Sequence, residues 1–89
     1  MSILVLARRN HTEAMRVAAG LTIVGHAVRL VFMGQALAET AENAEQVELL
    51  ELAEIAPETT LEAMADELPR LDEAALAEAI ATANRVISL

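Results

Sequence analysis

The first 34 residues constrain the fold more than any other part of the chain, because a strand, a helix and a second strand follow one another with few residues between them. Residues 2–7 form an apolar run, residues 12–24 place apolar side chains at helical spacing, and residues 28–33 form a second apolar run that ends at Gly34. Both runs are apolar on both faces, which is typical of parallel strands covered by helices on two sides. We therefore expect a right-handed βαβ unit.

Helix-end signals divide the next part of the chain. Asn10, with a glutamate three residues later, fits a capping box at the start of the first helix, and Gly25 fits its end. A glutamate falls at every third position from 39 to 54, and six such residues sweep the whole circumference of a helix. We therefore expect the second helix to begin near Asn43, as its cap, and Pro57 to end it.

The last third of the chain predicts short elements. Residues 58–61 are either a third strand or the entry to a helix, residues 61–68 predict a short helix, and residues 86–89 predict a final strand. Asp72 is expected to cap a helix that runs to about Asn84. Three side chains of that helix are expected to face inward: Leu76, Ile80 and Ala83.

These elements together predict an α/β fold, a three-layer sandwich with a mainly parallel sheet of about four strands. Residues 1–89 are expected to form a single domain, since a chain of 89 residues normally makes one. Phe32 is the only aromatic residue among Phe, Trp and Tyr, so little aromatic area anchors the core. A second subunit that covers one face would add stability.

Charge and composition narrow the classes of partner. The net charge is −8, with 14 acidic residues against six basic ones, all arginines, which argues against nucleic acid and anionic membrane surfaces as partners. The longest apolar region, residues 14–33, is interrupted by polar and charged residues and does not resemble a membrane span. The first apolar run precedes two arginines, the reverse of the order in a secretory signal, so we expect a cytoplasmic protein.

The candidate binding residues follow the two predicted strands, because ligands of open parallel sheets bind beyond the carboxyl ends of the strands. They are Arg8, Arg9, Asn10, His11, Thr12, Gly34 and Gln35. Two arginines, a histidine and a helix N-terminus can together hold an anion. The alternative is that the arginines are solvated loop charges and that Asn10 only caps the helix.

No residue is expected to be catalytic, to bind a metal or to hold a cofactor. The chain has no cysteine, so it has no thiolate zinc site and no thiol nucleophile. His11 is a possible acid or base without a second chemical residue tied to it by sequence, and His26 is expected to be a turn residue. The two histidines do not have metal-site spacing.

Two stretches carry a resemblance to a known family. Residues 14–37, with the segment Gly25-His26-Ala27-Val28-Arg29-Leu30-Val31-Phe32-Met33-Gly34, resemble the DsrE/DsrF/DsrH family, whose members often show a Gly-His-x-Val turn, an apolar strand and a glycine. The ending, residues 83–89, is similar to the helix-to-strand junction of that family, where an aspartate often stands at the position of Asn84. The resemblance implies a compact α/β fold, assembly into dimers, trimers or hexamers and, in some members, relay of sulfur as a cysteine persulfide.

Persulfide relay requires a thiol, and this chain has none. The resemblance therefore implies a non-catalytic DsrE-like protein, an oligomer-forming scaffold or partner subunit with a link to sulfur metabolism. Its expected partners are copies of itself or a cysteine-bearing paralogue, with some carboxylates of the glutamate series meeting arginines of a second subunit. The alternative function is a small-molecule or anion-binding module that uses the loops after the first two strands; an enzyme that depends on His11 ranks third.

Overall fold

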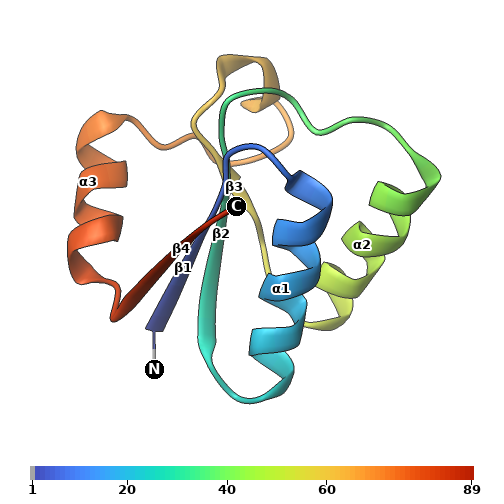
Figure 1. Cartoon of the computed structure of the whole chain (residues 1–89). Helices are drawn as coiled ribbons and strands as arrows, with labels where there is room; N and C mark the ends of the chain where they lie inside the picture. Colours follow the sequence, from blue (N-terminus) through green and yellow to red (C-terminus); the bar gives the residue numbers. More distant parts are fainter. Residues whose placement is uncertain (1) are drawn as a thin grey trace.

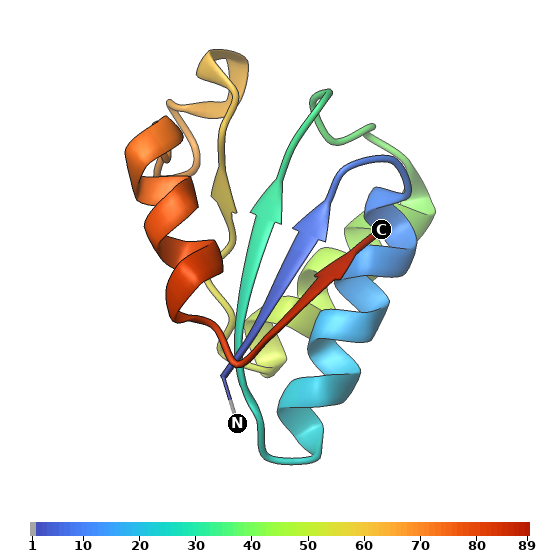
Figure 2. The same ribbon diagram turned by 60° about the vertical axis from the view of Figure 1, so that its left-hand side comes forward.

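A parallel sheet forms the middle layer of the protein, as seen in a computed structural model that describes residues 2–89. Its strands are β1 (Ser2–Ala7), β2 (Ala27–Phe32), β3 (Glu58–Thr59) and β4 (Arg85–Ser88), in the order β3-β2-β1-β4. All pairings are parallel, and the strands point toward the same edge of the molecule (Figure 2). Residues 58–61 therefore contribute a strand, although one of only two residues.

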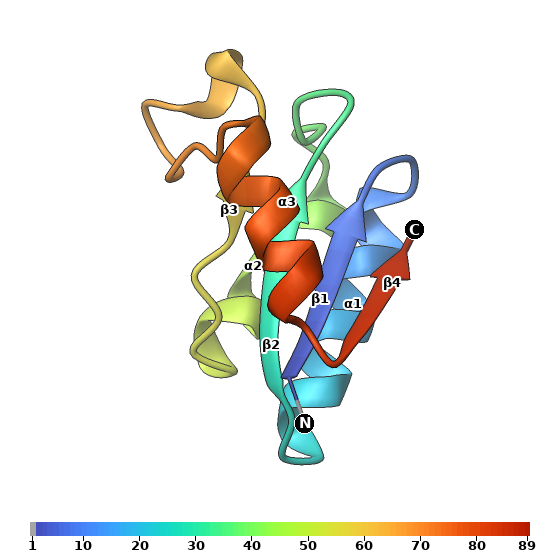
Figure 3. The same cartoon turned by 90° about the vertical axis from the view of Figure 1, so that its left-hand side faces the viewer.

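Three α-helices cover the two faces of the sheet. Helices α1 (His11–Ile23) and α2 (Ala41–Leu52) lie on one face, and α3 (Glu73–Thr82) lies on the other (Figures 1 and 3). The predicted α/β three-layer sandwich with a sheet of four strands is confirmed. No helix among residues 2–89 has the length and apolar character needed to cross a membrane.

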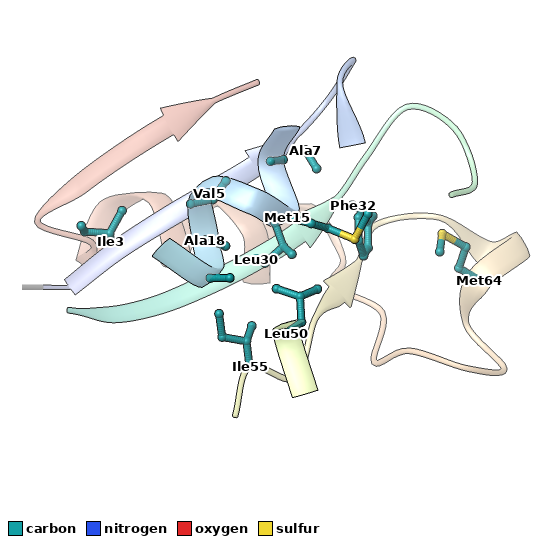
Figure 4. Packing of buried hydrophobic residues seen from close by; sticks show 12 residues of the cluster. Ile3, Val5, Ala7, Met15, Ala18, Leu30, Phe32, Leu50, Ile55 and Met64 are labelled. Carbon is teal, nitrogen blue, oxygen red and sulfur yellow. The ribbon is translucent and has the colours of Figure 1, made fainter. Parts of the chain in front are cut away.

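Alternating side chains of the central strands divide the core in two. Val5 and Leu30 face α1 and α2, and Figure 4 shows them gathered with Met15 and Leu50 of those helices. Leu4, Leu6 and Val31 face α3 and pack with Ala79. The apolar pattern on both faces of the first two strands is thus explained by burial under helices on both sides.

The expected start of the second helix was wrong. Thr40 is the N-cap of α2: its hydroxyl oxygen accepts the backbone N–H of Asn43 at 3.1 Å. Threonine at this position leaves the Asn43 side chain free to make tertiary hydrogen bonds, and that side chain is buried. The helix also ends earlier than expected, at Leu52, and the chain then turns through Glu54 at a φ of 60° before it reaches Pro57.

The predicted helix over residues 61–68 was also wrong. The 3-10 turn η1 (Glu62–Met64) forms there instead, followed by hydrogen-bonded turns in which the N–H groups of Glu67 and Leu68 donate to the carbonyl oxygen of Met64. Asp72 does cap α3, as predicted, and accepts the Ala75 N–H at 2.7 Å. Ile80, expected to face inward, is 42% exposed, since α3 is short and covers only the middle strands.

Candidate functional site

The loops after β1 and β2 approach each other closely at the carboxyl edge of the sheet. An added Cβ at Gly34 would lie 2.9 Å from the carbonyl oxygen of Arg8, and Gly34 has a φ of +82°. The Met33 N–H donates to the carbonyl oxygen of Ala7 at 2.9 Å, which continues the strand pairing up to this point. The structure therefore brings the two predicted loops together, with a glycine where a side chain would collide with backbone.

His11 is the first residue of α1 and is turned into the protein. Its side chain is 6% exposed, its Nε2 lies 3.1 Å from the carbonyl oxygen of Met33, and its ring packs edge to face on Phe32 with centroids 5.2 Å apart. A carbonyl oxygen only accepts, so Nε2 donates the proton in this contact. His11 thus ties α1 to the end of β2, a structural role that leaves Nδ1 as its remaining polar atom.

Asn10 caps α1, as predicted: its Oδ1 accepts the Glu13 N–H at 3.1 Å. The second half of a capping box does not form, because Glu13 binds Arg16 on the helix surface. That hydrogen bond is also the main reason why the pKa of Glu13 is lowered from its ordinary value. The backbone N–H groups of Arg9 and Asn10 donate to the carbonyl oxygen of Leu89 at 3.2 and 2.8 Å.

This contact with Leu89 lies beside the topological switch point of the sheet. The chain adds β2 and β3 on one side of β1 and then returns to add β4 on the other side. In doubly wound sheets such a point often holds the ligand, through backbone donors at the strand end. Here two of those donors are already satisfied by the chain itself. The edge of β1 is therefore less open to an anion than the sequence pattern indicates.

Asn43 is a site residue that the sequence did not identify as such. It accepts a hydrogen bond from the Thr12 hydroxyl and donates through Nδ2 to the carbonyl oxygen of Ala38 at 2.8 Å. It joins the first turn of α1 to the loop before α2. No sequence signal distinguishes this role from capping, because an asparagine near a helix start suits both.

One surface pocket collects most of the candidate residues. This pocket of about 320 Å³, called the Arg9 pocket below, is lined by Arg9, Asn10, His11, Thr12, Gln35, Ala38 and Asn43. Two candidates, Arg8 and Gly34, do not line it; Arg8 lines a separate hollow with Arg9, Ser88 and Leu89. The lining of the Arg9 pocket has one arginine and no glutamate or aspartate, although the chain has a net charge of −8.

A larger pocket adjoins it. This pocket of about 480 Å³, called the acidic pocket below, is lined by Leu37, Ala38, Glu39, Thr40, Ala41, Asn43, Ala44, Val47, Met64 and Glu67. Ala38 and Asn43 line both pockets, which are therefore neighbours. The acidic pocket has two carboxylates and no arginine. The sequence did not predict this pocket, because Met64 and Glu67 are separated along the chain from the other lining residues, which fall within 37–47.

The polar groups at this edge are an arginine, a histidine, amide and hydroxyl side chains, and two glutamates. Neither pocket contains a thiol, and the imidazole of His11 is held by Met33. Within residues 2–89, no three His, Asp or Glu side chains are grouped so that they could hold a metal ion. Searches of family models, of curated proteins and of solved structures found no match to this chain.

Proposed function

We propose that the protein is a non-catalytic DsrE-like subunit that acts by assembly, either with copies of itself or with a cysteine-bearing paralogue. The observation that supports this most strongly is the exposure of three large aliphatic side chains. Ile23 is 79% exposed, Val24 is 69% exposed and Leu52 is 82% exposed. They end helices α1 and α2, which pack against each other and both run away from the carboxyl edge of the sheet (Figure 1).

Aliphatic side chains at the ends of two neighbouring helices favour contact with another chain. Each fully buried side chain of this size is worth about 1.5–3 kcal/mol relative to leaving it in water. Groups of such side chains on soluble proteins mark interaction surfaces more often than single exposed residues do. Within this chain α1 packs on the sheet and on α2, and Ile23 and Val24 at its end remain exposed.

Two features of the chain's chemistry support the proposed non-catalytic role. No cysteine is present to carry a persulfide, and the histidine at the carboxyl edge has a structural hydrogen bond. A link to sulfur metabolism rests on the resemblance of residues 14–37 and 83–89 to the DsrE/DsrF/DsrH family. The same resemblance is the reason to expect a cysteine-bearing partner.

Sedimentation velocity of the purified protein tests the assembly. We expect the wild-type protein to sediment as an oligomer and the double variant Ile23→Gln, Leu52→Gln to shift toward smaller species. Both side chains are exposed, so the melting temperature of the isolated subunit should change little. The control is Ile80→Gln on α3, which is also partly exposed and should leave assembly unchanged. A wild-type protein that stays monomeric at high concentration and does not bind a cysteine-bearing paralogue would overturn the proposal.

A second function is supported by the Arg9 pocket, namely binding of a small anion. Its arginine, its amide side chains and the first turn of α1 all favour negative charge, and its lining has no carboxylate to oppose it. Thermal-shift titrations with phosphate, sulfate and nucleotides test this. We expect stabilisation that Arg9→Ala removes and Arg8→Ala retains, because Arg8 lies outside the pocket. No stabilisation by any of these anions would exclude this function.

A further inference from the structure

The Arg9 pocket and the acidic pocket lie next to each other and carry opposite charge. We propose that they form a two-fold interface between two copies of this chain, in which Arg9 of each copy enters the acidic pocket of the other. The inference rests on the proposed assembly function. It adds a second contact surface, separate from Ile23 and Leu52, and names a second copy as the partner and Arg9 as the residue that docks.

The arrangement suits a two-fold axis. In a symmetric dimer the same surface is used twice, so an attractive patch must be self-complementary. A basic pocket beside an acidic pocket meets this condition: rotation about an axis near their shared residues, Ala38 and Asn43, places each basic pocket over the acidic pocket of the other copy. If the surface had only one of the two pockets, the two-fold axis would place like charges opposite each other and the two copies would repel.

The acidic pocket has the chemistry to receive an arginine. Leu37, Val47 and Met64 provide apolar walls for the aliphatic stem of the side chain. Glu39 and Glu67 provide carboxylates for the guanidinium group, which binds carboxylates in a fixed, often bidentate geometry. Both glutamates are exposed, and neither forms an ion pair within residues 2–89.

Arg9 is available for this contact. The ion pairs formed by arginines of the described chain, residues 2–89, are Arg16 with Glu13 and Arg29 with Glu58. Arg9 is exposed and belongs to neither pair. Since the guanidinium group stays charged at all ordinary pH values, its binding to a carboxylate pocket needs no proton transfer.

Small residues at the two pockets allow close approach. Ala38 lines both pockets, Ala41 and Ala44 line the acidic pocket, and all three are exposed, so their side chains present little steric barrier to a facing copy. The net charge of −8 on each copy opposes association over long range. At physiological ionic strength that repulsion is screened beyond about 8 Å, so contacts of opposite charge at the interface outweigh it locally.

Charge reversal gives a sharp test, by native mass spectrometry or sedimentation of full-length protein. The variants Arg9→Glu and Glu67→Arg should each halve the mass of the wild-type assembly, because each places like charges across the two-fold axis. An equal mixture of the two variants should restore the wild-type mass: glutamate at position 9 then meets arginine at position 67, and the native Arg9 meets the native Glu67. Circular dichroism checks that each variant is folded.

Matched controls carry the same charge changes away from these pockets. Arg85→Glu on β4 and Glu78→Arg on α3 lie outside both pockets and should retain the wild-type mass. An assembly that tolerates Arg9→Glu and Glu67→Arg would overturn this interface but leave the assembly function standing. A monomeric wild-type protein would overturn both.

Discussion

Gly34 and Arg8 are the residues that determine how closely the loops after β1 and β2 approach each other at the carboxyl edge of the sheet. The Gly34 backbone has a positive φ, and the position of its missing Cβ is 2.9 Å from a backbone oxygen that cannot move independently of β1. His11 acts at the same edge through its hydrogen bond to Met33. These contacts fix how the loops after β1 and β2 meet at the carboxyl edge of the sheet.

Replacing Gly34 with alanine should destabilise the protein. The left-handed backbone conformation alone costs a non-glycine residue about 1–2 kcal/mol, and the clash with Arg8 adds to that cost. Urea denaturation of Gly34→Ala measures the loss. The matched control is Gly20→Ala, in the exposed surface of α1 with free space at the Cβ position, which should stabilise the protein by about 0.5–1 kcal/mol. Equal effects of both substitutions would contradict the described loop contact.

The carboxyl group of Glu13 should titrate below its ordinary range. The hydrogen bond from Arg16 favours the charged form and lowers its pKa. A lowered pKa in the folded state means that the contact is fully present at neutral pH and is lost as the pH falls through the folded-state pKa. Carbon-13 NMR titration reads this carboxyl group directly. Arg16→Gln should return the pKa toward its ordinary value; an unchanged pKa in that variant would exclude the pair as its cause.

Individual elements differ in how far the sequence could predict them. Asn10 and Asp72 cap their helices as predicted, because a cap depends on residues within one turn. The start of α2 could not be predicted from Asn43, since that side chain is used for contacts with Thr12 and Ala38 that are distant in sequence or outside the helix. Residues 61–68 form turns instead of the predicted helix, and no sequence signal used for that prediction distinguishes the two.

Thr59 is the residue on which β3 depends most. It is fully buried, and its hydroxyl donates to the carbonyl oxygen of Phe32 at 3.2 Å and accepts from the Leu61 N–H at 3.1 Å. Thr59→Val keeps the shape and removes both bonds, which leaves the Leu61 N–H without its acceptor. We expect a loss of about 1–3 kcal/mol in the free energy of unfolding. Thr82→Val on the exposed face of α3 is the control and should stay within about 0.5 kcal/mol of wild type.

Hydrogen exchange gives a second view of the same element. The N–H groups of Thr60 and Leu61 should exchange faster in Thr59→Val than in wild type, whereas those of the central strand β1 should change only as far as global stability changes. Unchanged exchange at both positions would show that β3 is held by other contacts.

The layered fold of the whole molecule can be predicted from the apolar pattern more directly than the pockets on its surface can. Leu4 and Val5 point to opposite faces of β1, and that alternation requires a layer of helices on each side. Most residues of the Arg9 pocket could be predicted, because they directly follow the first two strands, but the acidic pocket could not, because it combines α2 with residues near 64–67, which are distant along the chain. The exposure of Leu52 at the end of α2 likewise could not be predicted, because it depends on where that helix packs beside α1.

The proposed function of this chain is assembly without catalysis. Native mass spectrometry of the protein isolated from its own cell tests it most directly, because one spectrum reports the number of copies and any second chain together. We expect a mass of two or more copies, or of this chain with a cysteine-bearing chain. A spectrum with only single copies of this chain, free of any partner, would contradict it.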